Sequence, residues 1–215
     1  MSTDIRAVCG ETELPVALGQ RARTMQETRD RLIQAARAAF AEKGFAASSM
    51  DELTAAAGLT RGALYHNFGD KKGLLRAVIE QLDAEMLAKA RKARNSAHTP
   101  WLGFLAEGVA YIELALEPEI QRIMLLDGPA VLGDPSQWPG QNACLQTTTD
   151  SIAALIEAKT LRPVDAEAAA RLINGAALNA ALWVAASADP RAVLPKAVEA
   201  FRCLASGLLA PGAGG

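Results

Sequence analysis

Apolar side chains recur every three or four positions along most of this sequence, which is the period of an amphipathic helix. The first clear run is Met25, Thr28, Leu32, Ala36 and Phe40. Half of the 215 residues are hydrophobic, and alanine is the commonest of them, whereas aromatic and β-branched residues are scarce. Such a composition favours helices over strands. We therefore predict an all-α fold of about nine helices, in one or two domains.

Start and stop signals divide the first part of the chain into four helices. Residues 1–22 lack an apolar period and are expected to form a flexible tail. Gly44 ends the first helix, and Ser49 followed by Glu52 forms a capping box that starts the second. Thr60 is placed to cap the third. The helices expected here are 25–43, 50–57, 61–67 and 71–94.

The second part of the chain begins near Thr99 and Pro100, because proline suits the first turn of a helix. The stretch DGPAVLGDPSQWPGQ, residues 127–141, is rich in glycine and proline and is expected to be a loop. The helices expected around this loop are 101–116, 119–127, 142–159, 165–187 and 190 to about 206.

Charge is distributed unevenly between these two parts. The whole chain carries a net charge of −2. Residues 20–95 hold 14 Lys and Arg against 9 Asp and Glu, a net +5, whereas residues 96–215 hold 7 against 12, a net −5. The first 19 residues contribute the remaining −2. This asymmetry suggests two modules, of which only the first faces a polyanion.

The two short helices 50–57 and 61–67, joined by a turn at Gly58, form a helix-turn-helix pattern. Gly62 lies at the exposed start of the second helix, where a missing side chain lets the backbone approach a groove. Arg61 is placed to reach base edges or phosphate, and Tyr65 one turn later can offer its hydroxyl to phosphate. The alternative is a polar surface turn with no partner.

The stretch from Arg31 to Ile79 resembles the TetR family of bacterial transcriptional regulators. The resemblance rests on an apolar helix ending in Phe-x-x-x-Gly-Phe, then Ser-x-x-x-Leu, Ala-Gly-Leu-Thr, Gly-x-Leu-Tyr, Phe, and a Lys two residues beyond Gly69. It covers about residues 26–86, with the helix-turn-helix at 49–68, and implies that the rest, 95–210, is a helical ligand-binding and dimerisation domain.

The resemblance also implies which residues meet DNA. Residues 60–63 would enter the major groove, whereas Tyr65, Lys71 and the helix start at Ser48 and Ser49 would hold phosphates. Many members have His directly before the Phe, but here Asn67 stands there and His66 one position earlier. The candidate DNA-binding residues are Ser48, Ser49, Thr60, Arg61, Gly62, Ala63, Tyr65, His66, Asn67 and Lys71.

By the same resemblance, the acidic second part would hold a small-molecule pocket and a dimer face. Small residues line helix 165–187, so this helix and the last one could pair with their copies in a four-helix interface; alternatively, both are buried within one subunit. Asn174 and Asn179 could orient a ligand or bond across the dimer. Candidate pocket walls, each of which could instead be plain core, are Trp101, Phe104, Met124, Trp138 and Trp183.

Other classes of protein find less support in the sequence. Cys9, Cys144 and Cys203 are scattered and suggest neither disulfides nor a zinc site. No catalytic motif, metal-ligand pattern or cofactor fingerprint was found. No signal peptide and no apolar run near the ~20 residues of a membrane span was found either, so we expect a cytoplasmic protein without a membrane partner.

The sequence therefore predicts a DNA-binding transcriptional regulator that is not an enzyme. The most specific expectation is a ligand-responsive repressor that binds a palindromic operator on double-stranded DNA as a homodimer, under the control of an unidentified small-molecule effector and without a cofactor. The alternatives are a helical protein-interaction adaptor and a helical small-molecule-binding protein that does not bind DNA.

Overall fold

A computed structural model describes residues 14–212, and the regular elements in that range are all helices, with one isolated bridge between Leu161 and Leu209. The expected all-α fold is confirmed. The elements in chain order are α1 (Leu14–Lys43), α2 (Met50–Ala56), α3 (Arg61–Phe68), α4 (Lys71–Asn95), α5 (Pro100–Glu113), η1 (Leu114–Leu116), η2 (Ile120–Asp127), α6 (Gly128–Leu132), η3 (Pro135–Gln137), α7 (Pro139–Glu157), α8 (Ala166–Ala186) and α9 (Pro190–Ser206).

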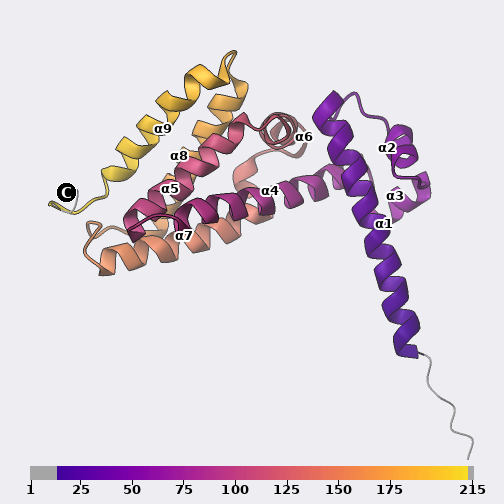
Figure 1. The fold of residues 1–215 in the computed structure, drawn as a ribbon, viewed down its shortest axis with the longest axis horizontal. Coiled ribbons are helices and arrows are strands. Elements are labelled where there is room, and N and C mark those ends of the chain that lie inside the picture. Colours follow the sequence, from indigo (N-terminus) through magenta and orange to yellow (C-terminus); the bar gives the residue numbers. More distant parts are fainter. Residues whose placement is uncertain (1–13, 213–215) are drawn as a thin grey trace, which may run out of the picture.

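Two domains are joined by the long helix α4 (Figure 1). Helices α2 and α3 lie beside the second half of α1, whose first half projects away from the rest of the molecule. Helix α4 runs from this small domain into a bundle formed with α5, α7, α8 and α9. The fold thus places the helix-turn-helix at one end and most of the apolar core at the other.

Local sequence signals set the ends of the short helices. The Ser49 hydroxyl accepts a hydrogen bond from the amide of Glu52, and the Glu52 carboxylate accepts one from the amide of Ser49, each at 3.1 Å, which completes the capping box. Thr60 caps α3 by accepting from the Ala63 amide at 3.3 Å. Gly58, with φ of +63°, makes the turn between α2 and α3 in the left-handed region that glycine tolerates.

The core of the small domain is the one that the apolar pattern predicts. Phe40, Leu53 and Leu64 are completely buried, and Phe68 packs against them while partly exposed. Burial of each such side chain contributes about 1.5–3 kcal/mol relative to leaving it in water. Short helices of seven and eight residues are held by this core rather than by their own hydrogen bonds.

Two boundaries differ from the sequence prediction. Helix α1 begins at Leu14, so residues 14–22 belong to a helix and not to the expected tail; residues 1–13 lie outside the described range. Met25 is 55 % exposed, and the buried stripe of α1 begins only at Leu32. The sequence of residues 14–24 has no sustained apolar stripe that would reveal a helix, whereas good helix formers such as Ala, Leu, Gln and Arg occur there.

The second difference is the segment expected to be one loop, residues 127–141. It contains α6, η3 and the start of α7. Pro129, Pro135 and Pro139 stand at the first or second position of these three elements, where proline needs no amide partner. These prolines therefore mark helix starts and not a loop. The preceding helix, expected at 119–127, is the π-helical segment η2.

Helix α8 is more apolar than the sequence argument allowed. By length and composition alone it could cross a membrane, and no other helix among the described residues could. In the structure, Ala170, Ala181 and Val184 on one side of α8 are buried within the bundle. We therefore describe α8 as a bundle helix, with an opposite side that carries exposed apolar residues.

Candidate nucleic-acid interface and effector pocket

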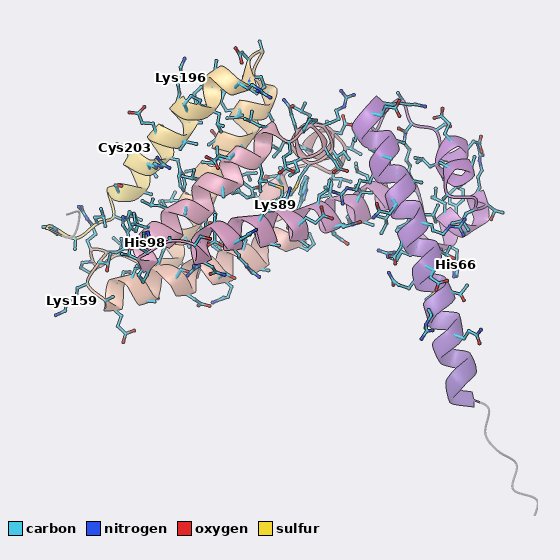
Figure 2. The ribbon with its side chains drawn as sticks, viewed as in Figure 1. His66, Lys89, His98, Lys159, Lys196 and Cys203 are labelled. Carbon is cyan, nitrogen blue, oxygen red and sulfur yellow. The ribbon has the colours of Figure 1, made fainter. Side chains whose placement is uncertain are left out.

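One side of α3 faces solvent, as the helix-turn-helix interpretation requires. Leu64 is fully buried, whereas Thr60, Arg61, Gly62 and His66 are exposed, and so is Tyr65, at 52 %. Figure 2 shows His66 in the small domain, far from the bundle. This polar face at one end of the molecule can reach a groove without hindrance from the larger domain.

Gly62 leaves open space at the start of α3. A Cβ built on it would meet only the Thr60 hydroxyl, at 3.7 Å. The backbone at Gly62 is ordinary helix and does not itself require glycine. The missing side chain therefore makes room for something outside the chain, which fits close approach of a DNA backbone or base edge.

Arg61 has a partner that sequence reasoning missed. Its guanidinium donates two hydrogen bonds to the carboxylate of Asp51, in the first turn of α2. The pair is exposed, and the hydrogen bond from Arg61 lowers the pKa of the Asp51 carboxyl. Asp51 thus holds Arg61 in the absence of DNA, and a guanine or phosphate would have to displace this carboxylate.

Two of the residues expected to bind DNA are committed to the fold instead. The Ser48 side chain is 1 % exposed and donates to the carbonyls of Gly44, at 2.9 Å, and Ala39, at 3.3 Å. In this geometry its hydroxyl is turned into the fold, so the exposed Ser49 is the better placed of the two for a phosphate. The side-chain amide of Asn67 donates to the Ala63 carbonyl at 2.8 Å, within α3. A sequence motif gives the position of a polar residue but not the direction of its side chain.

Lys71 is less accessible than expected. Its ammonium lies 4.3 Å from the centroid of the Phe45 ring, in cation–π contact. Partial burial lowers the pKa of Lys71, although Asp127 nearby acts in the opposite direction. To reach a phosphate, Lys71 would leave the Phe45 ring, whereas its neighbour Lys72 is already exposed.

Ionic contacts fasten the small domain to the large one. Arg37 on α1 donates to Glu85 on α4, at 2.6 and 2.8 Å, and to Glu119 just before η2, at 2.8 Å. Hydrogen bonding from Arg37 lowers the pKa of Glu85. Asp127 accepts from the backbone amide of Phe45 at 2.7 Å. A shift of α4 or η2 would therefore be transmitted to α1.

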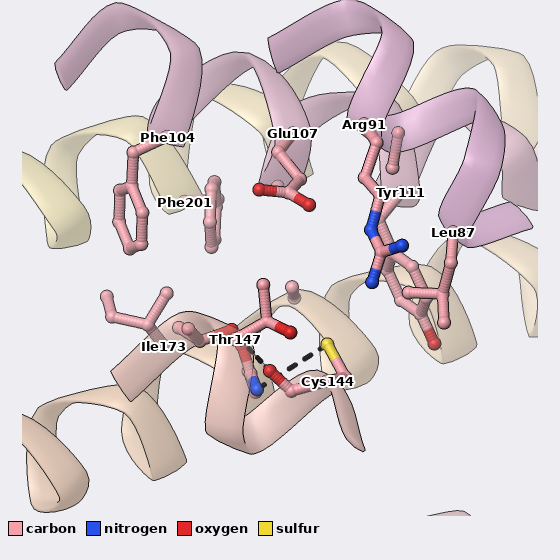
Figure 3. Close-up of a pocket in the computed structure, with 14 residues that line it drawn as sticks. Leu87, Arg91, Phe104, Glu107, Tyr111, Cys144, Thr147, Ile173 and Phe201 are labelled. Carbon is pink, nitrogen blue, oxygen red and sulfur yellow. Dashed lines mark hydrogen bonds between the residues drawn. The ribbon is translucent and has the colours of Figure 1, made fainter. Parts of the chain in front are cut away.

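A pocket with a volume of about 60 Å³ lies inside the large domain, between α4, α5, α7, α8 and α9. Figure 3 shows the Phe104 and Phe201 rings side by side at one end, Arg91 beside Tyr111 at the other, and Glu107 pointing into the space between. The lining residues are Leu87, Ala90, Arg91, Phe104, Glu107, Gly108, Tyr111, Cys144, Thr147, Thr148, Ile173, Asn174, Ala177 and Phe201.

Several polar side chains that line this pocket form hydrogen bonds or ion pairs with other residues of the chain. Asn174 accepts a hydrogen bond from Thr148 at 3.1 Å, and its amide lies 3.7 Å from the Cys144 sulfur. Burial raises the pKa of the Cys144 thiol, so it behaves as a neutral polar atom. Glu107 forms an ion pair with Arg94 at 3.1 Å. An apolar wall with a few polar groups is the usual composition of a small-molecule site.

The five aromatic and methionine candidates for pocket walls do not line one pocket. Phe104 lines the pocket, and Trp101 stacks on Phe104 with ring centroids 5.9 Å apart. Met124 is core, at 2 % exposure, and Trp138 lines a second cavity. Trp183 is 50 % exposed on α8 and lines neither of these two cavities. Glu107 was missed, although it is the one charged residue between Pro100 and Ile112.

The outward side of α8 carries exposed apolar residues. Leu172 is 73 % exposed and Trp183 is 50 % exposed, with Gly175 and Asn179 between them on the same side. Leu204, on the neighbouring α9, is 55 % exposed. Large exposed apolar side chains clustered on two adjacent helices are typical of an interface.

Two family models match the chain, one in each of its two domains. Residues 32–78 match the family described as bacterial regulatory proteins of the tetR family, and residues 101–208 match the tetracyclin repressor-like C-terminal domain. Among the residues that the structure describes, no group of three or more His, Cys, Asp or Glu could hold a metal ion.

Similar individual proteins include transcriptional regulators. The HTH-type regulator UidR of Escherichia coli is 31% identical over 102 residues, which is 47% of this chain and 50% of UidR. TtgR of Pseudomonas putida is 32% identical over 100 residues, 46% of this chain and 48% of TtgR. The alignments thus span about half the length of these curated relatives.

Solved structures extend the similarity over most of the chain. A TetR-family transcriptional regulator from Pectobacterium atrosepticum is 48% identical, with a TM-score of 0.81, and the alignment covers 87% of this chain and 96% of that one. RolR in complex with resorcinol shares the fold, with a TM-score of 0.61 and 20% identity, over 88% of this chain and 98% of RolR.

Proposed function

The chain belongs to the TetR family of bacterial regulatory proteins, and on that premise we propose that it is a ligand-responsive transcriptional repressor that binds a palindromic DNA operator as a homodimer. Proteins of this family regulate transcription and are not enzymes. The observation that carries the proposal is the exposed face of α3, where Arg61 and Tyr65 flank the open backbone at Gly62.

DNA binding would begin with an exchange of partners at Arg61. Its guanidinium is held by Asp51 in a bidentate pair, and a guanine offers two acceptors in the major groove for the same fork of donors. Tyr65, His66, Lys72 and, once it has left the Phe45 ring, Lys71 would contact phosphates around that base. The Ser49 and Thr60 caps would keep α2 and α3 rigid while these contacts form.

Dimerisation would bring two DNA-binding domains, one from each subunit, to one operator. The exposed face of α8 at Leu172, Gly175 and Trp183 supports this, together with Leu204 on α9. Gly175 leaves room for close contact, since a Cβ built there would meet no atom within 4 Å. Related by a two-fold axis, the two subunits would read a symmetric site.

An effector would bind in the large domain and act through α4. It can shift the spacing of the two DNA-binding domains only by binding one arrangement more tightly than the other. The effector should therefore weaken DNA binding, and DNA should weaken effector binding by the same factor. A small molecule bound to RolR, whose fold is shared, agrees with this arrangement. Action on a bacterial operator would place the protein in the cytoplasm.

Selection of bound duplexes from a random pool tests the proposal. The enriched sequences should contain a two-fold symmetric site whose halves are about one helical turn, roughly 34–36 Å, apart or a multiple of it. Failure to enrich any sequence at physiological salt would reject sequence-specific regulation and favour an adaptor or a small-molecule-binding protein. Enrichment of a single asymmetric half-site would reject the dimeric part.

A further inference from the structure

A second cavity lies between α4 and the beginning of α7, in the large domain. It has a volume of about 660 Å³, within the range of small-molecule sites. Ile79, Leu87, Leu132 and Pro139 form much of its apolar wall. Its charged lining residues are one arginine, Arg76, and three carboxylates, Glu80, Asp83 and Asp134, a formal charge of 1 − 3 = −2.

Asp83 is the unusual member of this lining. The residue is 8 % exposed, and its Oδ1 atom is buried without a hydrogen-bond partner among the described residues. Burial raises the pKa of its carboxyl. The other oxygen, Oδ2, lies beside Gly140 in the first turn of α7. A Cβ built on Gly140 would collide with this oxygen. An unpaired buried carboxylate oxygen is costly, and the described residues offer Oδ1 no partner.

Trp138 supplies a second unpaired group in the same cavity. Its ring lines the wall, and its indole N–H, a donor that an acceptor on the ligand rather than an ammonium group would satisfy, is buried without a hydrogen-bond partner in the described structure. A carboxylate acceptor, an aromatic face and an excess of negative charge together are complementary to a positively charged group.

We propose that this cavity binds an organic cation, a ligand with an ammonium group that pairs with Asp83 and an apolar body that lies against Trp138, Ile79 and Leu132. An amine supplies the N–H donors that Oδ1 lacks. The apolar body replaces water along the wall. An anionic ligand would face the net negative lining and is disfavoured.

The position of Asp83 on α4 could couple ligand binding at this site to DNA binding. Two residues further along α4, Glu85 binds Arg37 of α1. A cation that moves α4 would therefore disturb the junction with the DNA-binding domain. This regulatory meaning rests on the proposed function, whereas binding of the cation does not.

The test uses three probes of matched size and shape: 2-phenylethylamine, 2-phenylethanol and phenylacetate. Calorimetric titration of the full chain at pH ~7.5, without DNA, should give about tenfold or more tighter binding of the amine than of the other two. Asp83→Asn should reduce amine binding about tenfold or more. The control is Glu113→Gln, which removes an exposed carboxylate on α5 outside the cavity and should leave amine binding within about threefold of wild type.

Equal binding of amine and alcohol, absence of amine binding, or unchanged amine binding in Asp83→Asn would each overturn the proposal. A second readout retains Asp83 and so does not depend on that variant folding. With Trp101 and Trp183 replaced by Phe, Trp138 is the sole tryptophan, and its fluorescence should respond to the amine and not to phenylacetate. No response to the amine would also refute the site.

Addition of the amine to the complex with the selected duplex then separates the two proposals. Release of DNA would support the cation as effector. Binding without release would limit the site to binding and overturn its regulatory role, while leaving the DNA-binding proposal intact. If the protein selects no duplex but binds the amine through Asp83, the DNA-binding proposal is overturned and the cation site stands.

Discussion

Asp83→Asn should make the protein more stable at neutral pH, because a site kept for a ligand leaves the free protein with an unpaired carboxylate. A buried acceptor without a partner costs about 1–3 kcal/mol, and more when it is charged. Oδ1 of Asp83 is in this position, at 8 % residue exposure. Asparagine keeps the size and removes the charge, so we expect a gain of about 1–3 kcal/mol.

The pH dependence of this gain follows from the pKa of Asp83. Burial raises that pKa above its ordinary value of 3.8, so the folded protein binds the proton more tightly than the unfolded chain. Wild-type stability from this residue is therefore highest below 3.8 and is lost as pH rises through the raised pKa. Glu85 has a lowered pKa and acts in the opposite direction, but equally in both proteins.

Thermal melts of wild type and Asp83→Asn between pH ~4 and ~8 measure this difference. One kcal/mol corresponds to roughly 2–4 °C for a chain of this length, so the melting temperature of the variant should be higher by about 2–12 °C at neutral pH. The gap should close as pH falls. A variant less stable than wild type would mean that the carboxylate stabilises the fold, and a gap that does not change with pH would mean that the gain does not come from removing a charge; either result would refute the reasoning.

Three further predictions concern other parts of the molecule. Leu172→Glu should convert a dimer into a monomer in light scattering at micromolar concentration, and an unchanged dimer mass would place the interface elsewhere. Gly44→Ala should lower the unfolding free energy by about 1–3 kcal/mol in denaturant titrations, because φ is +82° and the Arg122 guanidinium occupies the place of a Cβ; an unchanged midpoint would contradict this. Lys71→Ala should flatten the plot of log DNA affinity against log salt by about 1.8 for a dimer, since each phosphate contributes roughly 0.9, whereas an unchanged slope would mean that Lys71 stays on Phe45.

Features that depend on neighbouring residues in the sequence were predicted well. The Ser49–Glu52 capping box and the Thr60 cap join residues three apart, and the buried Phe40, Leu53 and Leu64 follow from helical period. Short-range hydrogen bonds and one-sided apolar stripes are written directly in the order of residues.

Features that join distant segments were not predictable. The pair of Asp51 with Arg61, and the contact of Asp83 with Gly140, depend on how separate helices pack. The same limit applies to the exposed position of Trp183. Helix α8 has small or apolar residues on nearly every side, so its sequence does not tell which side faces the core.

The most direct test of the account is the affinity of Arg61→Ala for the selected duplex and for a random duplex, measured by fluorescence anisotropy at fixed salt. Lys196→Ala, which removes an exposed cation on α9 far from α3 (Figure 2), is the control. If Arg61 reads a base, the variant should lose about tenfold or more per half-site on the selected duplex and much less on the random one. Equal loss on both duplexes would make Arg61 a phosphate contact, and no loss on either would contradict the assignment of α3 as the DNA-reading helix.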